Sequence, residues 1–276
     1  HMKTQRVLGV MSGTSLGGVD FALCLVNGSG VQFKKIWSHK FPRELQARLY
    51  RAVSNRLSTY QLAQVHHDLG RFYAKVAPHV AFDYIGLHGQ TVFHNPTGAH
   101  KGATLQIGEP SYLAARFRKP VVCQFRNMDL ALGGQGAPLA TAFHVKEFGD
   151  AKRAIAVQNL GGIGNVTYID GKKVLAFDTG PGNMLIDYAA RHFSKGKETI
   201  DHHGNWASQG VVHRGLVDKW MKHPFIKKRP PKSTGREDFG HHFFQELLLD
   251  GKKRKLSAAD FMATITWFTA ESITDA

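Results

Sequence analysis

The hydrophobic pattern predicts two stretches of chain that open in the same way. Apolar runs at residues 7–11, 19–26 and 31–37 have the length and composition of strands, and turn residues separate them. A second series starts at residues 154–160 and continues at 166–169 and 174–177, with Asp170-Gly171 as a strong turn signal. Each series begins with a hairpin whose turn is rich in glycine. The chain therefore looks like two related halves.

Between and after these hairpins, apolar spacings of three and four predict helices at residues 43–55, 60–81, 110–117, 138–148 and 184–190. Short strands at residues 84–87, 104–107 and 121–125 alternate with one of them, which indicates βαβ organisation and a partly parallel sheet. Residues 206–249 are expected to be mostly helical. A capping box at Ser257 starts a last helix. The predicted class is α/β, with domains at residues 1–150 and 151–276.

Composition is that of a soluble globular protein, with 42% hydrophobic and 21% charged residues. No apolar stretch reaches the roughly 18 residues that a membrane span needs, and no signal segment opens the chain. We expect a cytoplasmic protein without a membrane partner, as a monomer or a homodimer.

Charge and histidine content each suggest a function that the local sequence disfavours. The net charge of +15 would suit a nucleic acid, but the densest basic runs, residues 227–229 and 252–255, lack interleaved aromatic residues. Several of the 16 histidines are adjacent pairs, which cannot both face one site on a helix. We expect a solvated basic surface, no nucleic acid partner and no dedicated transition-metal site.

The turn at residues 12–20 carries the first candidate chemistry. Its glycine and hydroxyl residues let backbone N–H groups and Oγ atoms approach phosphate oxygens, although the turn matches neither common phosphate-binding motif. An ordinary glycine-rich hairpin is the alternative. The phosphate-binding candidates are Ser12, Gly13, Thr14, Ser15, Leu16, Gly17, Gly18, Val19 and Asp20, with Gly161, Gly162 and Asn165 in the turn of the second half.

Asp178 is the candidate catalytic residue, because it stands where an apolar strand gives way to a helix. That is the usual place for a catalytic carboxylate in an α/β enzyme. A helix N-cap is the alternative role for an acid in the sequence Asp-Thr-Gly-Pro-Gly.

Seven ordered blocks resemble the motifs of the anhydro-N-acetylmuramic acid kinase family: VMSGTSLGGVD, GLHGQTVFH, TLQIGEP, QFRNMDLALGGQGAPLA, NLGGIGNVTYI, AFDTGPGNMLIDYAA and KSTGRE. The resemblance covers nearly the whole chain. It implies a duplicated actin- or hexokinase-like ATPase fold, with ATP and Mg²⁺ as cofactors and an anhydro amino sugar as substrate, in cell-wall sugar recycling. Asp178 would activate the water that opens the 1,6-anhydro ring while O6 takes the γ-phosphoryl group. The sugar-side residues would be His88, Gln90, Thr91, Glu109, Arg126, Gly180 and Asn183.

Three departures from the family pattern support an alternative. Gly17 replaces an acid expected to organise Mg²⁺, and Gln124 replaces an acid that would pair with Arg126. The family pattern also continues beyond Ala276 into a segment that contacts the adenosine. The alternative is a truncated or catalytically impaired remnant that binds sugar or a partner without turnover. We then expect the apolar residues of the last helix, Phe261, Ile265 and Phe268, to have exposed neighbours.

Overall fold

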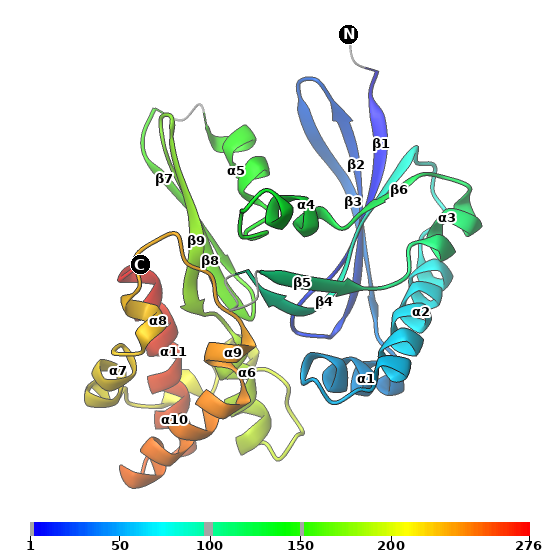
Figure 1. Ribbon diagram of the computed structural model, residues 1–276. Coiled ribbons are helices and arrows are strands. Elements are labelled where there is room, and N and C mark those ends of the chain that lie inside the picture. The colour runs from blue at the N-terminus through cyan, green and yellow to red at the C-terminus, as the bar shows by residue number, and fades with distance from the viewer. Residues whose placement is uncertain (1–2, 97–101, 150–151) are drawn as a thin grey trace. The chain divides into compact units, whose positions relative to one another are not determined.

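The computed structural model describes residues 3–96, 102–149 and 152–276, and the chain divides into two compact units, residues 1–139 and 140–276 (Figure 1). Helix α5 (Thr141–Phe148) belongs to the second unit, whereas the expected boundary at residue 150 would assign it to the first. It packs on β8 (Ile163–Asp170), and Nδ1 of His144 lies 2.9 Å from Oγ1 of Thr167. The observed division therefore falls before this helix.

The first unit is built on a six-stranded sheet. Strands β1 (Gln5–Ser12), β2 (Gly18–Asn27) and β3 (Gly30–Lys40) form an antiparallel meander. Strand β4 (Tyr84–Asn95) pairs in parallel with β1. On the other side of β4 lie β5 (Ala103–Ile107), which is antiparallel to it, and β6 (Val121–Cys123), which is parallel. The predicted partly parallel sheet is confirmed in this unit.

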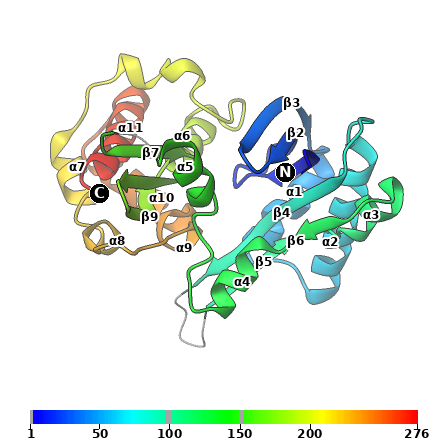
Figure 2. The ribbon, with the colours of Figure 1, turned by 90° about the horizontal axis from the view of Figure 1, so that it is seen from above.

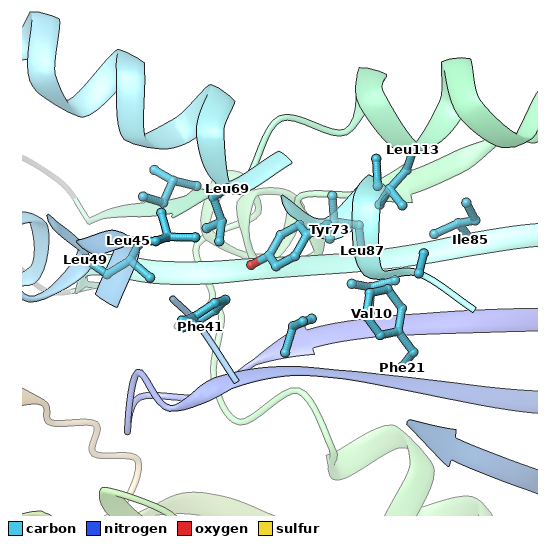
Figure 3. Close-up of a cluster of buried hydrophobic side chains, with 14 of the residues drawn as sticks. Val10, Phe21, Phe41, Leu45, Leu49, Leu69, Tyr73, Ile85, Leu87 and Leu113 are labelled. Carbon is cyan, nitrogen blue, oxygen red and sulfur yellow. The ribbon is translucent and has the colours of Figure 1, made fainter. Parts of the chain in front are cut away.

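Helices α1 (Arg43–Val53), α2 (Thr59–Val76) and α3 (Ser111–Phe117) contribute side chains to the core of this unit. Helix α2 begins at a complete capping box between Ser58 and Gln61. Figure 3 shows Leu49 of α1 and Leu69 and Tyr73 of α2 above the strands that carry Val10 and Phe21. This core fixes the end of β1, from which the first glycine-rich turn projects.

Two local predictions for this unit were wrong. Strand β4 continues through His88–His94, beyond the end expected at residue 87, because the segment pairs with β1 on one side and β5 on the other. The strand expected at residues 121–125 ends at Cys123. Gln124 then adopts a left-handed conformation (φ 60°) and helix α4 (Phe125–Ala131) begins, which no apolar periodicity had indicated.

The second unit contains the antiparallel sheet β7 (Ile155–Leu160), β8 and β9 (Lys173–Pro181), in that order. The predicted hairpin between β8 and β9 is confirmed, with Gly171 at φ +56° in the turn. The other elements of this unit are α6 (Met184–Phe193), η1 (His202–Gly204), η2 (Ala207–Gln209), α7 (Arg214–Trp220), α8 (Pro224–Lys227), α9 (Arg236–Phe239), α10 (His241–Lys253) and α11 (Ala258–Thr274) (Figure 2).

Helix α11 is a core element of the second unit. Phe261, Ile265 and Phe268 are buried, with at most 2% of each residue exposed. The helix packs on α6, α7 and β9, and the ring of Phe261 contacts those of Trp220 and Phe244. The expectation that these residues would have exposed neighbours is wrong, because helices from residues 184–253 supply the apolar partners.

Within the described ranges, we find no helix with both the length and the apolar character needed to cross a membrane.

Candidate functional site

The first glycine-rich turn is held from below by two buried side chains. Leu16 is fully buried at φ +58°, and Val19 follows it into the core. The N–H of Leu16 donates to the carbonyl of Gly13 at 3.2 Å, and its own carbonyl accepts a 2.8 Å hydrogen bond from Nε2 of Gln46. Next to the buried Leu16 on either side, Thr14, Ser15 and the glycines at 13 and 17 are exposed. The tip therefore offers main chain and hydroxyl groups to an anion from solvent.

Other members of the predicted phosphate set support the turn from inside the unit. Ser12 is buried, and its Oγ lies 2.7 Å from the hydroxyl oxygen of Tyr73. A Cβ at Gly18 would stand 2.3 Å from the carbonyl oxygen of His39 on the neighbouring strand. Asp20 is exposed on β2 and accepts a 2.5 Å hydrogen bond from Ser38. These contacts shape the turn and hold it on the sheet.

The parallel pairing of β1 and β4 places the second motif beside this turn. Ser12 is the register partner of Gln90, and Met11 is the partner of Gly89. Gln90 is completely buried, and its Nε2 donates to the carbonyl of Thr91 at 3.3 Å. Its Oε1 has no hydrogen-bond partner within the described part of the chain. A buried amide acceptor left in this state costs about 1–3 kcal/mol, so it is a natural position for a ligand donor.

Arg126, on α4, connects this strand with the glycine-rich segment that follows the helix. Its Nε donates to Nε2 of His88 at 3.2 Å, and its Nη1 donates to the carbonyl of Gly136 at 2.6 Å. Burial, and secondarily the charge of Arg126, lower the pKa of His88, which favours the neutral ring. Because Nε2 accepts, the proton lies on Nδ1, 2.9 Å from the carbonyl oxygen of Gly89.

Gln124 and Thr91 each accept a hydrogen bond from the side-chain amide of a neighbouring residue. The Oε1 of Gln124 accepts a 3.3 Å hydrogen bond from Nδ2 of Asn127. Thr91 Oγ1 accepts one of 3.3 Å from Nε2 of Gln106. His88, Gln90 and Thr91 thus lie on β4, and Arg126 reaches this strand through its hydrogen bond to His88.

Glu109 is occupied by contacts at the start of α3. One carboxylate oxygen lies 3.0 Å from Nε2 of His66, and the other accepts hydrogen bonds from the N–H and hydroxyl of Ser111, at 2.9 and 2.6 Å. The bonds from Ser111, followed by that from His66, lower the pKa of Glu109. The N–H of Gly108 donates to Nδ1 of His66. These bonds give Glu109 a clear part in organising this junction.

We expect His94 to make the stability of the first unit sensitive to acid. Burial and the charge of Arg126 lower the pKa of His94 to about 4, against a smaller opposing effect from the backbone of Gln135. An unfolded histidine titrates near pH 6.5, so the unfolded state binds the proton more readily. We expect this contribution to stability to be complete above about pH 6.5 and to be lost as the pH falls toward 4.

Urea unfolding of the parent and His94→Asn at neutral pH and at about pH 4.5 measures this contribution. The amide keeps a polar group near Thr104, which lies 2.9 Å from Nδ1 of His94. The variant should lose less stability on acidification than the parent. An equal loss in both proteins would assign the acid sensitivity to other groups, of which His88 is the first to test.

Asp178, in the second unit, is buried inside β9 with 7% of the residue exposed. Its N–H donates to the carbonyl of Lys232 at 3.0 Å, and its Oδ2 accepts a 2.9 Å hydrogen bond from the N–H of Thr234. Asn165 on β8 is its register partner. The N-cap of α6 is Asn183, so the alternative in which Asp178 caps the helix is wrong. Strand β9 continues past Asp178 to Pro181, and helix α6 begins only at Met184.

The second glycine-rich turn is fastened to the start of α6. The carbonyl of Gly161 accepts from the N–H of Asn183 at 2.8 Å, and that of Gly162 accepts from Gly182 and Met184 at 2.9 and 3.2 Å. A Cβ at Gly182 would lie only 2.1 Å from the carbonyl oxygen of Gly161. Gly180, at φ +134°, and the exposed Asn183 flank this junction. The turn, the helix start and Asp178 therefore form one local group.

Sequence reasoning assigned no role to several residues of this group. Thr234 lies in the KSTGRE block, which was part of the resemblance and was the available signal for it. Gln158 Nε2 donates to Oγ1 of Thr179 at 3.3 Å, while its buried Oε1 has no hydrogen-bond partner in the ranges that the structure describes. In the sequence, the available signal for Gln158 is its position in the strand that leads into the second glycine-rich turn.

Metal coordination by protein side chains alone has no support in the described residues. No group of three or more His, Cys, Asp or Glu side chains is arranged there to hold an ion. Asp20 is the carboxylate of the first turn, and its Oδ1 accepts from Ser38.

Comparison with known proteins defines the class as a sugar kinase. The family model described as anhydro-N-acetylmuramic acid kinase matches residues 5–276, and the chain belongs to this family.

Relatives with this name come from distant bacteria. The protein of Picosynechococcus sp. is 37% identical over 97% of this chain and 75% of its own length. That of Bacillus cereus (strain Q1) is 41% identical over 97% of this chain and 74% of its own. Among solved structures, the Aquifex aeolicus PPX-GPPA enzyme aligns with 99% of this chain and 91% of its own at 11% identity and a TM-score of 0.37, a likeness too slight to bear on the fold. Nothing in these comparisons supports the non-catalytic alternative.

Proposed function

We propose that this protein is an ATP-dependent kinase that converts 1,6-anhydro-N-acetylmuramic acid to N-acetylmuramic acid 6-phosphate, in cell-wall sugar recycling. Water adds to C1 and the C1–O6 bond breaks. O6 then forms a bond to the γ-phosphorus of ATP, and ADP leaves. The proton released by the water goes to a general base, which we assign to Asp178. The fold we propose is actin- or hexokinase-like, since each unit contains a three-stranded antiparallel meander.

The orientation of Asp178 is the observation that carries this proposal. A general base must be held in one position and must be ionised before it takes a proton. The N–H of Thr234 donates to Oδ2 of the Asp178 carboxylate at 2.9 Å, which fixes the rotation of this group. Burial excludes most solvent from the carboxylate, so a water bound there is the one it would activate.

The remaining assigned residues supply binding. In the proposal, the exposed tip at residues 13–17 and the turn at Gly161-Gly162 approach ATP phosphates through backbone N–H groups. His88, Gln90, Thr91 and Arg126 contact the sugar. The Oε1 of Gln90, which has no hydrogen-bond partner among the described residues, accepts from one of the sugar's hydroxyl or amide groups. Glu109, Gly180 and Asn183 complete the proposed substrate set.

Mg²⁺ would enter with ATP rather than reside in a protein cage. It usually keeps several waters and takes one or two carboxylates together with substrate phosphates. Asp20 is the acid at the first turn that fits this description, although Ser38 already donates to it. When bound, the ion neutralises charge on the transferring phosphoryl group. We propose a cytoplasmic enzyme that takes only these small molecules, with no nucleic acid or membrane partner.

The proposed reaction is tested by incubating the chain with ATP, Mg²⁺ and the anhydro sugar, and by measuring ADP release and sugar products together. We expect one ADP for each sugar 6-phosphate, and proton NMR should show the anhydro C1 signal replaced by the two anomers of a free reducing end. ADP release without the sugar phosphate would contradict the proposal. So would a phosphorylated sugar that keeps its anhydro ring.

Gly17 is the departure from the family pattern that a single substitution can reverse. A Cβ at this exposed position would meet only Oγ of Ser15, at 3.7 Å, so an aspartate fits the turn without strain. We expect Gly17→Asp to raise kcat about tenfold, and only with Mg²⁺ present, because a carboxylate there acts through the metal ion and its waters. Initial rates across a Mg²⁺ titration measure the effect.

Gly28→Asp is the matched control, because it adds the same charge where a Cβ has no neighbour within 4 Å. It should leave the rate and its Mg²⁺ dependence unchanged. If Gly17→Asp is no faster than the parent at any Mg²⁺ concentration, the missing acid does not limit the rate, and Gln124 becomes the next substitution to reverse.

A further inference from the structure

Lys232 is a buried lysine that the reaction described above does not use. Only 6% of the residue is exposed, although lysine is among the residues least often buried. Its Nζ donates to the carbonyl of Ile226 at 3.2 Å. The ammonium group also lies 5.2 Å from the ring centroid of Phe225 and 5.8 Å from that of Phe177. A cation between two aromatic rings and a carbonyl is held by its surroundings.

These contacts join three segments of the second unit. Phe225 and Ile226 belong to α8, and Phe177 immediately precedes Asp178 on β9. Lys232 itself lies in the segment between α8 and α9. Its side chain therefore fastens this segment to α8 and to the strand that carries the proposed base.

The main chain of the same segment holds Asp178 directly. The carbonyl of Lys232 accepts from the N–H of Asp178, and two residues later the N–H of Thr234 donates to the Asp178 carboxylate. The hydroxyl of Thr234 donates to Asp238 at 2.6 Å, which anchors the other end of the segment. Residues 232–234 thus behave as a short strap along β9, tied down at one end by the Lys232 side chain.

We propose that Lys232 is a positioning residue for Asp178: its buried ammonium group holds the strap at residues 232–234 in place, so that the Thr234 N–H fixes the rotation of the Asp178 carboxylate. The proposal rests on the assignment of Asp178 as the general base. Charge on Lys232 supplies the attraction to both rings and strengthens the bond to the Ile226 carbonyl. An apolar side chain of the same length would fill the space but would lose the attraction to the rings and the hydrogen bond to the Ile226 carbonyl.

Amide hydrogen exchange tests the strap in a way that does not depend on turnover. In the parent, the N–H groups of Asp178 and Thr234 should be protected. We expect Lys232→Met to raise their exchange rates about tenfold or more, while amides in the middle of β8 keep their rates. Lys228→Met is the matched control, since Lys228 is exposed in the same stretch of chain and should leave both amides protected.

Kinetics tests the consequence for the proposed base. Lys232→Met should lower kcat for sugar phosphorylation about tenfold and leave KM for ATP within about twofold, because the base loses orientation while nucleotide contacts stay. Lys232→Arg, which keeps the charge and the donors, should recover most of the rate.

Unchanged exchange at Thr234 in Lys232→Met, or an equal effect in Lys228→Met, would overturn the proposal. If Lys232→Met does not fold, Phe225→Leu takes its place, because it removes one ring beside the ammonium group. It should raise exchange at Thr234 by a smaller factor, and no change there would also overturn the proposal. A parent that protects both amides but never phosphorylates the sugar would instead refute the proposed function.

Discussion

Replacing Asp178 with asparagine should lower kcat for phosphorylation of the anhydro sugar by about 10³-fold, which lies within the usual contribution of a general base. An amide cannot take a proton from the attacking water. It fills the same volume, and its oxygen can still accept from the N–H of Thr234, so the local structure should persist. Initial rates with saturating ATP and sugar measure the effect. Circular dichroism and thermal unfolding check that the fold is intact.

Asp170→Asn is the matched control for this substitution. Asp170 lies on the same sheet and is the exposed last residue of β8. Its loss of charge should leave kcat within about twofold of the parent, as is usual for a substitution remote from the site. A comparable loss in both variants would show that net charge on the sheet matters rather than the position of one base. Equal turnover by Asp178→Asn and the parent would remove Asp178 from the mechanism.

Gly182→Ala should destabilise the second unit by about 3 kcal/mol, at the upper end of the usual cost of overpacking. Its Cβ would stand 2.1 Å from the carbonyl oxygen of Gly161 and 3.2 Å from the N–H nitrogen of Gly164. Both neighbours are main chain, so no side chain can rotate away to make room. The glycine-rich turn must then separate from the start of α6, with loss of the hydrogen bonds from residues 182–184 to Gly161 and Gly162.

We expect the Tm for unfolding of the second unit to be lower in Gly182→Ala than in the parent by on the order of 10 °C, and thermal unfolding measures this difference. Gly28→Ala provides the comparison, because a methyl group at that position meets no atom within 4 Å. Its Tm should match that of the parent. A Gly182→Ala protein that unfolds at the parent's Tm would mean that the turn and the helix start are not rigidly joined, and the local group around Asp178 would need to be described again.

Local patterns in the sequence predicted most of the fold. Runs such as residues 7–11 and 19–26 are apolar because they are strands with buried side chains. The two strands pair with each other and are close in sequence, so one short stretch of chain specifies the hairpin. The extension of β4 through His88–His94 was missed because its partners are β1 and β5, and non-local pairing leaves little trace in a single segment. Helix α4 was missed for a related reason, since none of its residues is buried to create a periodic stripe.

The residues proposed for the candidate site are visible in the sequence only in part. The glycine-rich turns and Asp178 stand out because small residues and an acid interrupt apolar strands. The contacts that orient them do not, because they join distant residues. Thr234 is 56 positions from Asp178 in the sequence. Leu16 anchors its turn with a positive φ, a conformation that a leucine in the sequence gives no reason to expect. The helix-cap alternative for Asp178 failed because β9 continues to Pro181 before α6 begins.

In the proposed reaction, Asp178 activates the water whose oxygen bonds to C1, while O6 receives the phosphoryl group. Isotope labelling tests this step most directly. The reaction is run with ATP, Mg²⁺ and the anhydro sugar in ¹⁸O-enriched water, and the sugar 6-phosphate is analysed at once by mass spectrometry and ¹³C NMR. We predict one ¹⁸O per product molecule, bonded to C1, with none at O6, and formation of labelled product about 10³-fold more slowly by Asp178→Asn. A product without ¹⁸O at C1, or labelled product formed at the parent rate by Asp178→Asn, would contradict the account.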